Sequence, residues 1–236
     1  MSFLKAEWRR LALANYEVAP DVLKPYLPYK TELDLYNGIC YVSLVGFMFK
    51  NTKVLGVKIP GHINFEEVNL RFYVRFKEAG VWKRGVVFVK EIVPKHAITF
   101  VANYLYNEVY ETRNMSHSWE ERENELFTAY RWKNKKDWFS FSVISDTIAK
   151  PIPLNSDTEF ITEHYWGYNK TGKTKTTEYQ VTHPKWNAYN VKSYNIEVDF
   201  AKEYGEDFQF LNKTEPLSVM LAEGSPITVE GKKILR

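Results

Sequence analysis

Hydrophobic and polar residues alternate with period two from Glu66 to Phe76. One face of this segment would carry Val68, Leu70, Phe72, Val74 and Phe76, and the other Glu67, Asn69, Arg71, Tyr73 and Arg75. Successive side chains of a strand point to opposite faces, so the alternation predicts a strand with one apolar and one polar face. The polar face holds the densest charge on any strand-like stretch of the chain, and we therefore expect a site there.

A second strand-like segment, Arg84–Val93, follows this strand after the connection Lys77–Lys83. Gly80 lies at the middle of the connection. Two strands joined by a short glycine-containing connection predict an antiparallel hairpin.

The register of this hairpin decides which charged groups meet. With the turn centred on Gly80, Asn69 would face Glu91 directly, and Glu67 and Arg71 would flank Glu91 diagonally on the same face. Long side chains can bridge the diagonal spacing between neighbouring strands. We therefore expect Glu91 to pair with Arg71 across the hairpin.

The rest of the chain predicts short strands and a few helices. Pro94 begins a segment with apolar residues at helical spacing, and Pro20 precedes a second, shorter helix. The continuous apolar stretch Ile39–Lys50 predicts a strand buried on both faces. Further strands are expected at Leu4–Tyr16, Tyr110–His117, Glu125–Lys133, Trp138–Ser145, Thr176–Thr182, Ala188–Val198, Ser218–Ala222 and Ile227–Val229.

These elements predict an α+β fold, mostly antiparallel and barrel-like, with a few flanking helices. No linker or change of composition divides the 236 residues, so we expect a single domain spanning residues 1–236. Hydrophobic residues make up 44% of the chain and aromatic residues 16%, which is enough to fill a large core.

Charge and hydropathy exclude several classes of partner. The 32 basic residues barely outnumber the 29 acidic ones and are interspersed with them, so no nucleic-acid partner is expected. The longest apolar run, Gly38–Phe49, is about half of the roughly 20 residues of a membrane-spanning helix, and no secretory signal is evident. We expect a cytoplasmic protein with no membrane partner, and a buried, inert Cys40 within that run.

The motifs that mark common cofactor and catalytic sites are absent from the sequence. It has no P-loop, no Gly-x-Gly-x-x-Gly, no Gly-x-Ser-x-Gly, no Cys-x-x-Cys and no His-Glu-x-x-His. Nucleotide hydrolysis, dinucleotide redox chemistry and serine-hydrolase chemistry are therefore not expected, and no cofactor is predicted. The five histidines never fall three or four residues apart, so we predict no metal site.

Glu67, Arg71 and Glu91 are the first candidates for a binding site. An enclosed carboxylate beside a cation is the arrangement that a general base or a proton donor needs. The alternative is that the three residues form a structural ion-pair network on a solvated sheet face. The sequence leaves both interpretations open.

Asn107, Glu108 and His183 are further candidates. Asn107 and Glu108 follow the helix that begins at Pro94 and would project an amide and a carboxylate toward the hairpin. An ordinary helix end capped by Asn107 explains them equally well. His183 is either a titratable group at a cavity rim or part of a structural corner between two strands.

Several longer motifs distributed along nearly the whole chain carry a resemblance. They are Trp8-x-x-Leu11, Asn15-Tyr16-x-Val18, Tyr26-Leu27-Pro28, Gly38-x-x-Tyr41-Val42-Ser43-Leu44-Val45-Gly46-Phe47, Phe65-Glu66-Glu67-Val68-Asn69-Leu70-Arg71, Arg84-Gly85-Val86-Val87-Phe88, Tyr106-Asn107-Glu108-x-Tyr110 and His183-Pro184-x-Trp186. Together they resemble the YqjF-like bacterial family of unknown function. That family is similar, more distantly, to acetoacetate decarboxylase, which implies a cone-shaped, mainly antiparallel β-barrel around a buried, mostly hydrophobic cavity.

The similarity to the decarboxylase also implies where its chemistry would lie. That enzyme forms a Schiff base through a lysine that follows a proline and precedes a second lysine. The matching stretch here, Leu105–Tyr110, contains no lysine, so Schiff-base decarboxylation is not expected. The cavity carboxylate of the decarboxylase has a counterpart in Glu67, whereas its cavity arginine matches Glu17.

We therefore expect a protein that binds a small apolar carbonyl compound or organic acid. Glu67, Arg71, Asn107 and Glu108 would line the cavity, with Glu91 behind Arg71. One alternative is a cofactor-free isomerase or lyase that uses Glu67 or Glu108 as general base. Another is a non-enzymatic interaction module that forms a homo-oligomer through its aromatic residues.

Overall fold

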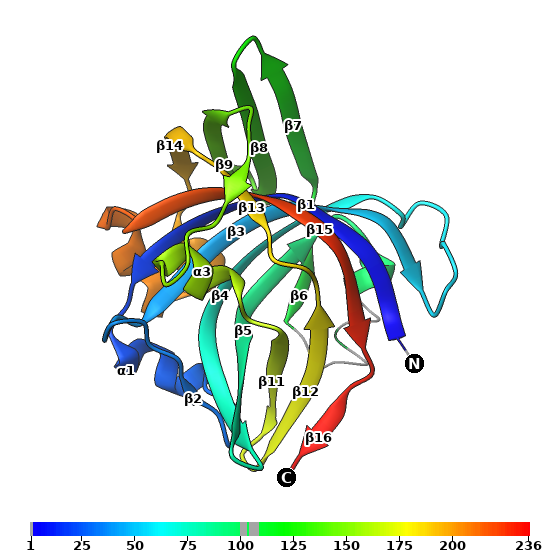
Figure 1. Cartoon of the computed structure of the whole chain (residues 1–236), viewed down its shortest axis with the longest axis vertical. Coiled ribbons are helices and arrows are strands. Elements are labelled where there is room, and N and C mark those ends of the chain that lie inside the picture. The colour runs from blue at the N-terminus through cyan, green and yellow to red at the C-terminus, as the bar shows by residue number, and fades with distance from the viewer. Residues whose placement is uncertain (1, 100–102, 104–108) are drawn as a thin grey trace.

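The computed structural model describes residues 2–99, 103 and 109–236. Strands dominate it (Figure 1). They are β1 (Ser2–Glu17), β2 (Glu32–Leu33), β3 (Tyr41–Val54), β4 (Phe65–Glu78), β5 (Val81–Val93), β6 (Tyr110–Thr112), β7 (Met115–Arg122), β8 (Glu125–Asn134), β9 (Asp137–Asp146), β10 (Lys150–Pro151), β11 (Trp166–Gly172), β12 (Lys175–Thr182), β13 (Asn187–Tyr189), β14 (Val191–Glu197), β15 (Ser218–Glu230) and β16 (Lys233–Leu235). The helical segments are α1 (Pro20–Leu23), η1 (Lys24–Tyr26), α3 (Asp157–Thr162), α4 (Phe200–Tyr204) and η2 (Glu206–Lys213).

In the described part of the chain, twelve strands form one large sheet, in the order β10-β13-β15-β1-β3-β4-β5-β11-β12-β16, with β2 beside β4 and β6 beside β5. Most neighbours are antiparallel; β5 pairs in parallel with β6 and β11. Strand β15 also pairs with β12, at Val181–Val229 and Thr182–Thr228. The predicted mostly antiparallel fold is confirmed.

Strands β1, β3 and β4 lie at the centre of this sheet and separate two hydrophobic cores. Residues Tyr41–Phe49 of β3 are all buried, as the continuous apolar stretch predicts. Along β4, Val68, Leu70 and Phe72 enter one core and Phe65 and Tyr73 the other. The side of the sheet that carries Phe65 and Tyr73 also carries the polar residues of β4, and the pocket described below lies there.

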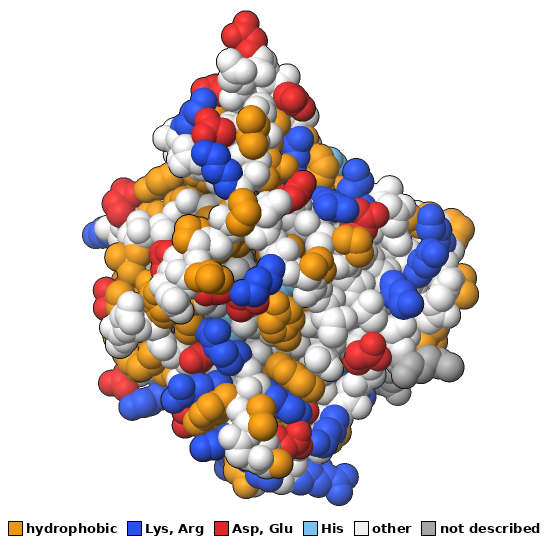
Figure 2. Space-filling view, in the orientation of Figure 1, with side chains coloured by type: hydrophobic (Ala, Val, Ile, Leu, Met, Phe, Trp, Pro, Cys, Tyr) orange, Lys and Arg blue, Asp and Glu red, His pale blue; other side chains and the backbone are white. Residues whose placement is uncertain are grey.

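A second, smaller sheet has the order β14-β9-β8-β7 and packs its apolar face on the first core. Strands β7, β8 and β9 extend away from the large sheet at the top of Figure 1. On the face shown in Figure 2, basic and acidic side chains are interspersed, in keeping with the near balance of charge in the sequence. No helix among residues 2–99, 103 and 109–236 is long and apolar enough to cross a membrane.

Some predicted strands have other boundaries in the structure. The segment Tyr110–His117 is divided between β6 and β7, and Ala188–Val198 between β13 and β14, which belong to different sheets. The two predicted strands at the C-terminal end are one continuous strand, β15. Pairing with β1 along Ser218–Glu230 overrides the local turn signal of Gly224-Ser225-Pro226. Of the helix predicted from Pro94, residues 96–99 and 103 are helical, and residues 100–102 and 104–108 lie outside the described residues.

Candidate functional site

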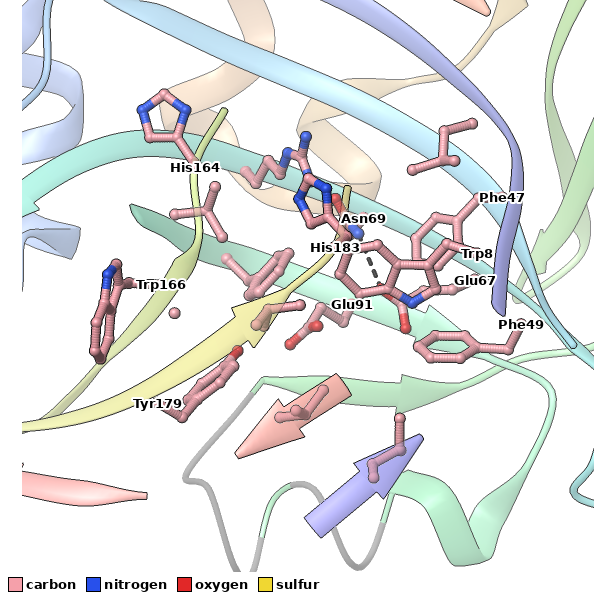
Figure 3. Close-up of a pocket in the computed structure, with 18 of the residues that line it drawn as sticks. Trp8, Phe47, Phe49, Glu67, Asn69, Glu91, His164, Trp166, Tyr179 and His183 are labelled. Atoms are coloured by element: carbon pink, nitrogen blue, oxygen red, sulfur yellow. Dashed lines mark hydrogen bonds between the residues drawn. The ribbon is translucent and has the colours of Figure 1, made fainter. Parts of the chain in front are cut away.

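A pocket of about 130 Å³ lies against the polar face of β4 and β5, enclosed by β1, the segment after α3, β11 and β12. Its wall is rich in aromatic rings from distant parts of the chain (Figure 3). They include Trp8, Phe47, Phe49, Phe88, Tyr179 and Trp186. One water molecule needs about 10–15 Å³ by the same measure, so the pocket has room for a ligand of roughly ten non-hydrogen atoms.

Four polar side chains of the β4–β5 hairpin line this apolar pocket: Glu67, Asn69, Arg71 and Glu91. Their exposed fractions are 2%, 1%, 7% and 2%, so the polar face predicted from the sequence is enclosed and not solvated. These residues therefore do not lie on the solvated sheet face that the alternative interpretation assumes. Desolvated charges on an apolar wall are typical of ligand sites.

Two described residues orient the Glu67 carboxylate, each through a hydrogen bond to one of its oxygens. The Asn69 amide nitrogen donates to Oε1 at 2.9 Å, drawn as a dashed line in Figure 3, and the Tyr110 hydroxyl donates to Oε2 at 2.9 Å. Both donors stabilise the charged form of the carboxylate. Glu67 is thus held in one orientation at the pocket wall.

Asn69 faces Glu91 across the hairpin, as the sequence predicts, but two features combine to produce this register. The turn consists of Ala79 and Gly80, with φ of 48° and 85°, and not of a loop centred on Gly80. A two-residue turn with both φ values positive matches the twist of the strands that it joins. If the pairing set by this turn continued without interruption along both strands, Asn69 would lie opposite Lys90.

A β-bulge corrects the register by one residue. The pairing passes from Arg71–Phe88 to Leu70–Lys90, so Val89 is the extra residue on β5. A bulge changes which residues of its strand point to a given face. Phe88 on one side of it and Glu91 on the other therefore both line the pocket.

Arg71 forms no ion pair with any residue that the structure describes on this face. No described residue accepts a hydrogen bond from its buried Nε, and its guanidinium carbon lies 5.8 Å from the centre of the Tyr73 ring. The expected Arg71–Glu91 pair is not formed, because the bulge places Arg71 opposite Phe88. A buried cation with an unsatisfied donor on an apolar wall can bind an anion that the protein does not supply.

His164 is a pocket residue that sequence reasoning did not select. It follows α3, a helix whose N-terminus is capped by Ser156, and only 1% of its side chain is exposed. Its Nε2 lies 3.2 Å from the Asp34 carboxylate, and Nδ1 has no partner among the described residues. Asp34 is 130 residues away in the sequence, so no local pattern marks this pair.

The environment of His164 keeps its ring neutral. Burial lowers the pKa of His164 to about 4, an effect that the Asp34 carboxylate opposes and the charges of Arg84 and Arg71 reinforce. Burial raises the pKa of Asp34, but hydrogen bonds from His164 and Arg84 outweigh it and hold that pKa below its usual value. The pair is therefore a neutral imidazole beside a carboxylate at neutral pH.

His183 lines the same pocket, at the position that the sequence analysis proposed for a cavity rim. Its ring is stacked on Trp186 at 4.3 Å and lies 4.7 Å from Tyr165. Burial lowers the pKa of His183, and a hydrogen bond between its Nδ1 and the Pro184 carbonyl opposes this shift. His183 therefore fits both interpretations. Its stacking on Trp186 belongs to the corner between the two strands and also holds the imidazole at the rim of the pocket.

Asn107 and Glu108 lie outside the described residues. Cys40 does not line the pocket, and burial raises the pKa of its thiol to about 11. No lysine is among the described lining residues, and no group of three or more His, Cys, Asp or Glu in the described chain could hold a metal ion.

Several solved structures superimpose on this chain, and acetoacetate decarboxylases are among them. The acetoacetate decarboxylase of Legionella pneumophila superimposes with a TM-score of 0.66, at 13% identity, over 99% of this chain and 87% of that chain. The enduracididine biosynthesis enzyme MppR complexed with pyruvate superimposes with a TM-score of 0.68, at 11% identity, over 100% and 91% of the two chains. At these identities the similarity establishes the fold alone.

The sequence comparisons define the family. Residues 5–226 match the model of the DUF2071 family, described as an uncharacterized conserved protein, and the chain belongs to that family. The uncharacterized protein YqjF of Bacillus subtilis (strain 168) is 25% identical over 193 residues, which cover 80% of this chain and 76% of that protein. The resemblance expected from the motifs is thereby confirmed.

Proposed function

We propose that the protein binds a small organic acid in the pocket on the β4–β5 face, with the carboxylate against Arg71 and the carbon chain against the aromatic wall. The main support for this proposal is Arg71 Nε, which is buried and for which no described residue provides a hydrogen-bond acceptor. A guanidinium presents paired donors that fit a carboxylate. The apolar wall and the volume of about 130 Å³ favour a short carbon chain.

The structural neighbours support the same class of ligand. One of them, the enduracididine biosynthesis enzyme MppR, was solved complexed with pyruvate, a short carboxylic acid. The pairing of β12 with β15 supports the cone-shaped barrel that the resemblance to the decarboxylase predicts. We propose that the pocket operates without a Schiff base, because its described lining contains no lysine that could form one.

Thermal unfolding with short-chain monocarboxylates, and with their uncharged methyl esters, tests this function. A ligand at about 100 times its Kd should raise Tm by about 5–10 °C, and the matching ester should not. Arg71→Ala should abolish the rise while circular dichroism shows an intact fold. Arg75→Ala is the matched control, since Arg75 lies on the same strand but pairs with Glu32 outside the pocket. An unchanged rise in Arg71→Ala, or no rise with any acid, would contradict the proposal.

A second candidate is an enzyme that uses Glu67 as general base on the bound acid, as in an isomerase or lyase. It is supported by the buried, doubly hydrogen-bonded Glu67 carboxylate, whose fixed orientation suits proton abstraction. Glu67→Gln keeps the shape of the side chain and removes the base. The enzyme hypothesis predicts that this variant still binds the acid but no longer turns it over, measured by NMR exchange of the acid's carbon-bound protons with D2O.

A further inference from the structure

The described wall of the pocket carries more acidic groups than basic ones. Glu67 and Glu91 contribute two carboxyl groups, Arg71 contributes one guanidinium, and no lysine is among the described lining residues. All three side chains are buried on the hairpin face of the pocket. With both carboxyl groups ionised, two negative charges face one positive charge in an apolar enclosure.

No other ionisable group in the pocket supplies a compensating cation. His164 and His183 line it too, but burial lowers the pKa of both rings, so they are neutral at neutral pH. Residues 100–102 and 104–108 contain no Lys, Arg or His in the sequence, so they add no positive charge. The excess of acidic groups is therefore a property of the site.

A simple carboxylate bound to Arg71 would add a third negative charge to this wall. The three anionic groups would then share one guanidinium around a volume of about 130 Å³ that is lined mainly by apolar side chains. Like charges repel strongly where water does not screen them. The charge balance therefore favours an acid that also carries a positive charge.

Glu67 is the carboxyl group farther from Arg71. It lies four residues before Arg71 on β4, which is roughly 13 Å along a strand that rises about 3.3 Å per residue. Its oxygens accept the hydrogen bonds from Asn69 and Tyr110 described above, so its orientation is already set. Glu67 therefore adds charge to the wall at a distance from the guanidinium.

Glu91 lies nearer to Arg71. It is opposite Asn69, two residues from Arg71, so the diagonal between the two backbones is roughly 7–8 Å. Figure 3 shows the Glu91 side chain among the lining side chains, between Tyr179 and Glu67. A carboxylate can accept several hydrogen bonds at once, so a ligand cation can add to the contacts that Glu91 already makes. A short ligand can thus reach both Arg71 and Glu91.

We propose that the ligand of this pocket is a short amino acid, whose carboxylate binds Arg71 and whose protonated amine lies against Glu91. This inference rests on the proposed function and specifies its ligand. A protonated amine is a strong donor to a carboxylate, and the apolar wall strengthens the contact by excluding water. The spacing of Arg71 and Glu91 favours an amine several bonds from the carboxylate, as in a γ-amino acid, over one on the adjacent carbon.

Amino acids paired with acids in which a methyl group replaces the ammonium group test this charge. The pairs are 2-aminobutyrate with 2-methylbutyrate, 3-aminobutyrate with 3-methylbutyrate, and 4-aminobutyrate with pentanoate. By isothermal titration calorimetry at neutral pH, 4-aminobutyrate should bind roughly tenfold tighter than pentanoate. Binding of the methyl acids with no advantage for any amino acid would overturn this inference and leave the proposed function intact. Binding of no compound in either series would count against the proposed function itself.

Glu91→Gln identifies the group that binds the amine. The variant keeps the shape of the side chain and removes its charge, so the advantage of 4-aminobutyrate over pentanoate should disappear while pentanoate still binds. Glu78→Gln is the matched control, because Glu78 belongs to the same hairpin but pairs with Lys83 and Lys233 outside the pocket. An advantage that survives in Glu91→Gln would overturn the assignment of the amine to Glu91.

Proton uptake on binding tests the inference in the unmodified protein. Calorimetry in two buffers of different ionisation enthalpy gives the number of protons that enter the complex, and Glu67, Glu91, His164 and His183 are the lining groups that can receive them. Pentanoate makes the wall more negative and favours protonation of these groups, whereas 4-aminobutyrate brings its own positive charge. The complex with 4-aminobutyrate should therefore take up fewer protons than the complex with pentanoate. Equal uptake for the two ligands would overturn the inference.

Discussion

Asn69 lies directly opposite Glu91 in the β4–β5 hairpin and donates a hydrogen bond to Glu67 at 2.9 Å, so a neutral amide stands between two buried carboxylates. Asn69→Asp would put three carboxylates on one enclosed wall. Like charges in a medium of low dielectric disfavour ionisation, and the new carboxyl would take up a proton or destabilise the fold. The free energy of unfolding should fall by about 2–4 kcal/mol at pH 8, and by less at pH 5.

Urea denaturation at the two pH values measures this difference. Asn69→Leu is the control, because it also removes the hydrogen bond to Glu67 but adds no charge. Its loss of stability should be similar at pH 5 and pH 8. A loss in Asn69→Asp that is equally independent of pH would show that charge crowding is not the cause.

The polar face of β4 could be predicted from the sequence because its signal is local. Alternation with period two assigns Glu67, Asn69 and Arg71 to one face whatever the rest of the chain does. Their enclosure could not be predicted, since it depends on rings such as Trp8 and Trp186, which reach the pocket from distant segments. Period-two alternation is equally compatible with a solvated face.

The opposite strand shows how a correct prediction can rest on an incomplete reason. Glu91 faces Asn69 only because a two-residue turn and a bulge at Val89 shift the register in opposite directions. Neither feature has a reliable local signal here. The predicted ion pair of Glu91 with Arg71 assumed that Arg71 lies opposite Val89, whereas Arg71 lies opposite Phe88 and no such pair is formed.

His164 marks the limit of sequence reasoning at this site. Glu163-His164 lies in a stretch whose pattern fits a strand and a short helix equally, and its role depends on Asp34 and Arg84 from two other segments. Only the fold brings these three residues together. A buried histidine that pairs with a distant carboxylate has no spacing rule by which it can be found.

Because Gly167 has no side chain, the Tyr179 ring can pack against its backbone in the pocket wall. A Cβ added at Gly167 would lie 2.1 Å from Tyr179 Cζ, so Gly167→Ala must displace the tyrosine ring. We expect the free energy of unfolding to fall by about 1–3 kcal/mol, and acid binding to weaken because the wall changes shape. Gly172→Ala on the same strand is the control: its nearest contact would be Lys175 Cβ at 4.0 Å, and both stability and binding should be unchanged.

Lys90 stabilises a buried carboxylate on the opposite side of the sheet from the pocket. Its Nζ lies 3.4 Å from the Glu203 carboxylate, whose side chain is fully buried and also accepts a hydrogen bond from Asn134 at 3.0 Å. Lys90→Met should lower the free energy of unfolding by about 2–4 kcal/mol, because it leaves Glu203 without its nearest cation. Lys202→Met removes an exposed lysine 3.2 Å from Asp137 and should cost under about 1 kcal/mol. Similar losses in the two variants, measured by chemical denaturation, would contradict this role of Lys90.

His164 should make the protein less stable in mild acid. An unfolded histidine titrates near pH 6.5, whereas burial lowers the pKa of His164 to about 4 in the folded protein. Between these values the unfolded chain binds a proton that the folded ring does not. The contribution of the neutral His164 ring to the free energy of unfolding is therefore present above pH 6.5 and is lost as the pH falls toward 4. At about 1.4 kcal/mol per pKa unit, this loss in the free energy of unfolding amounts to roughly 3 kcal/mol.

The groups that face His164 do not obscure this effect. Asp34 titrates below this range, because its pKa is held under its usual value, and Arg84 and Arg71 stay charged throughout. His164→Gln cannot take up a proton, so its free energy of unfolding should decline less than that of the unmodified protein between pH 6.5 and 4. His96→Gln, at an exposed histidine, is the matched control for the replacement of a histidine by glutamine. Parallel profiles for His164→Gln and the unmodified protein, measured by urea denaturation across this range, would show that the buried imidazole does not titrate as described.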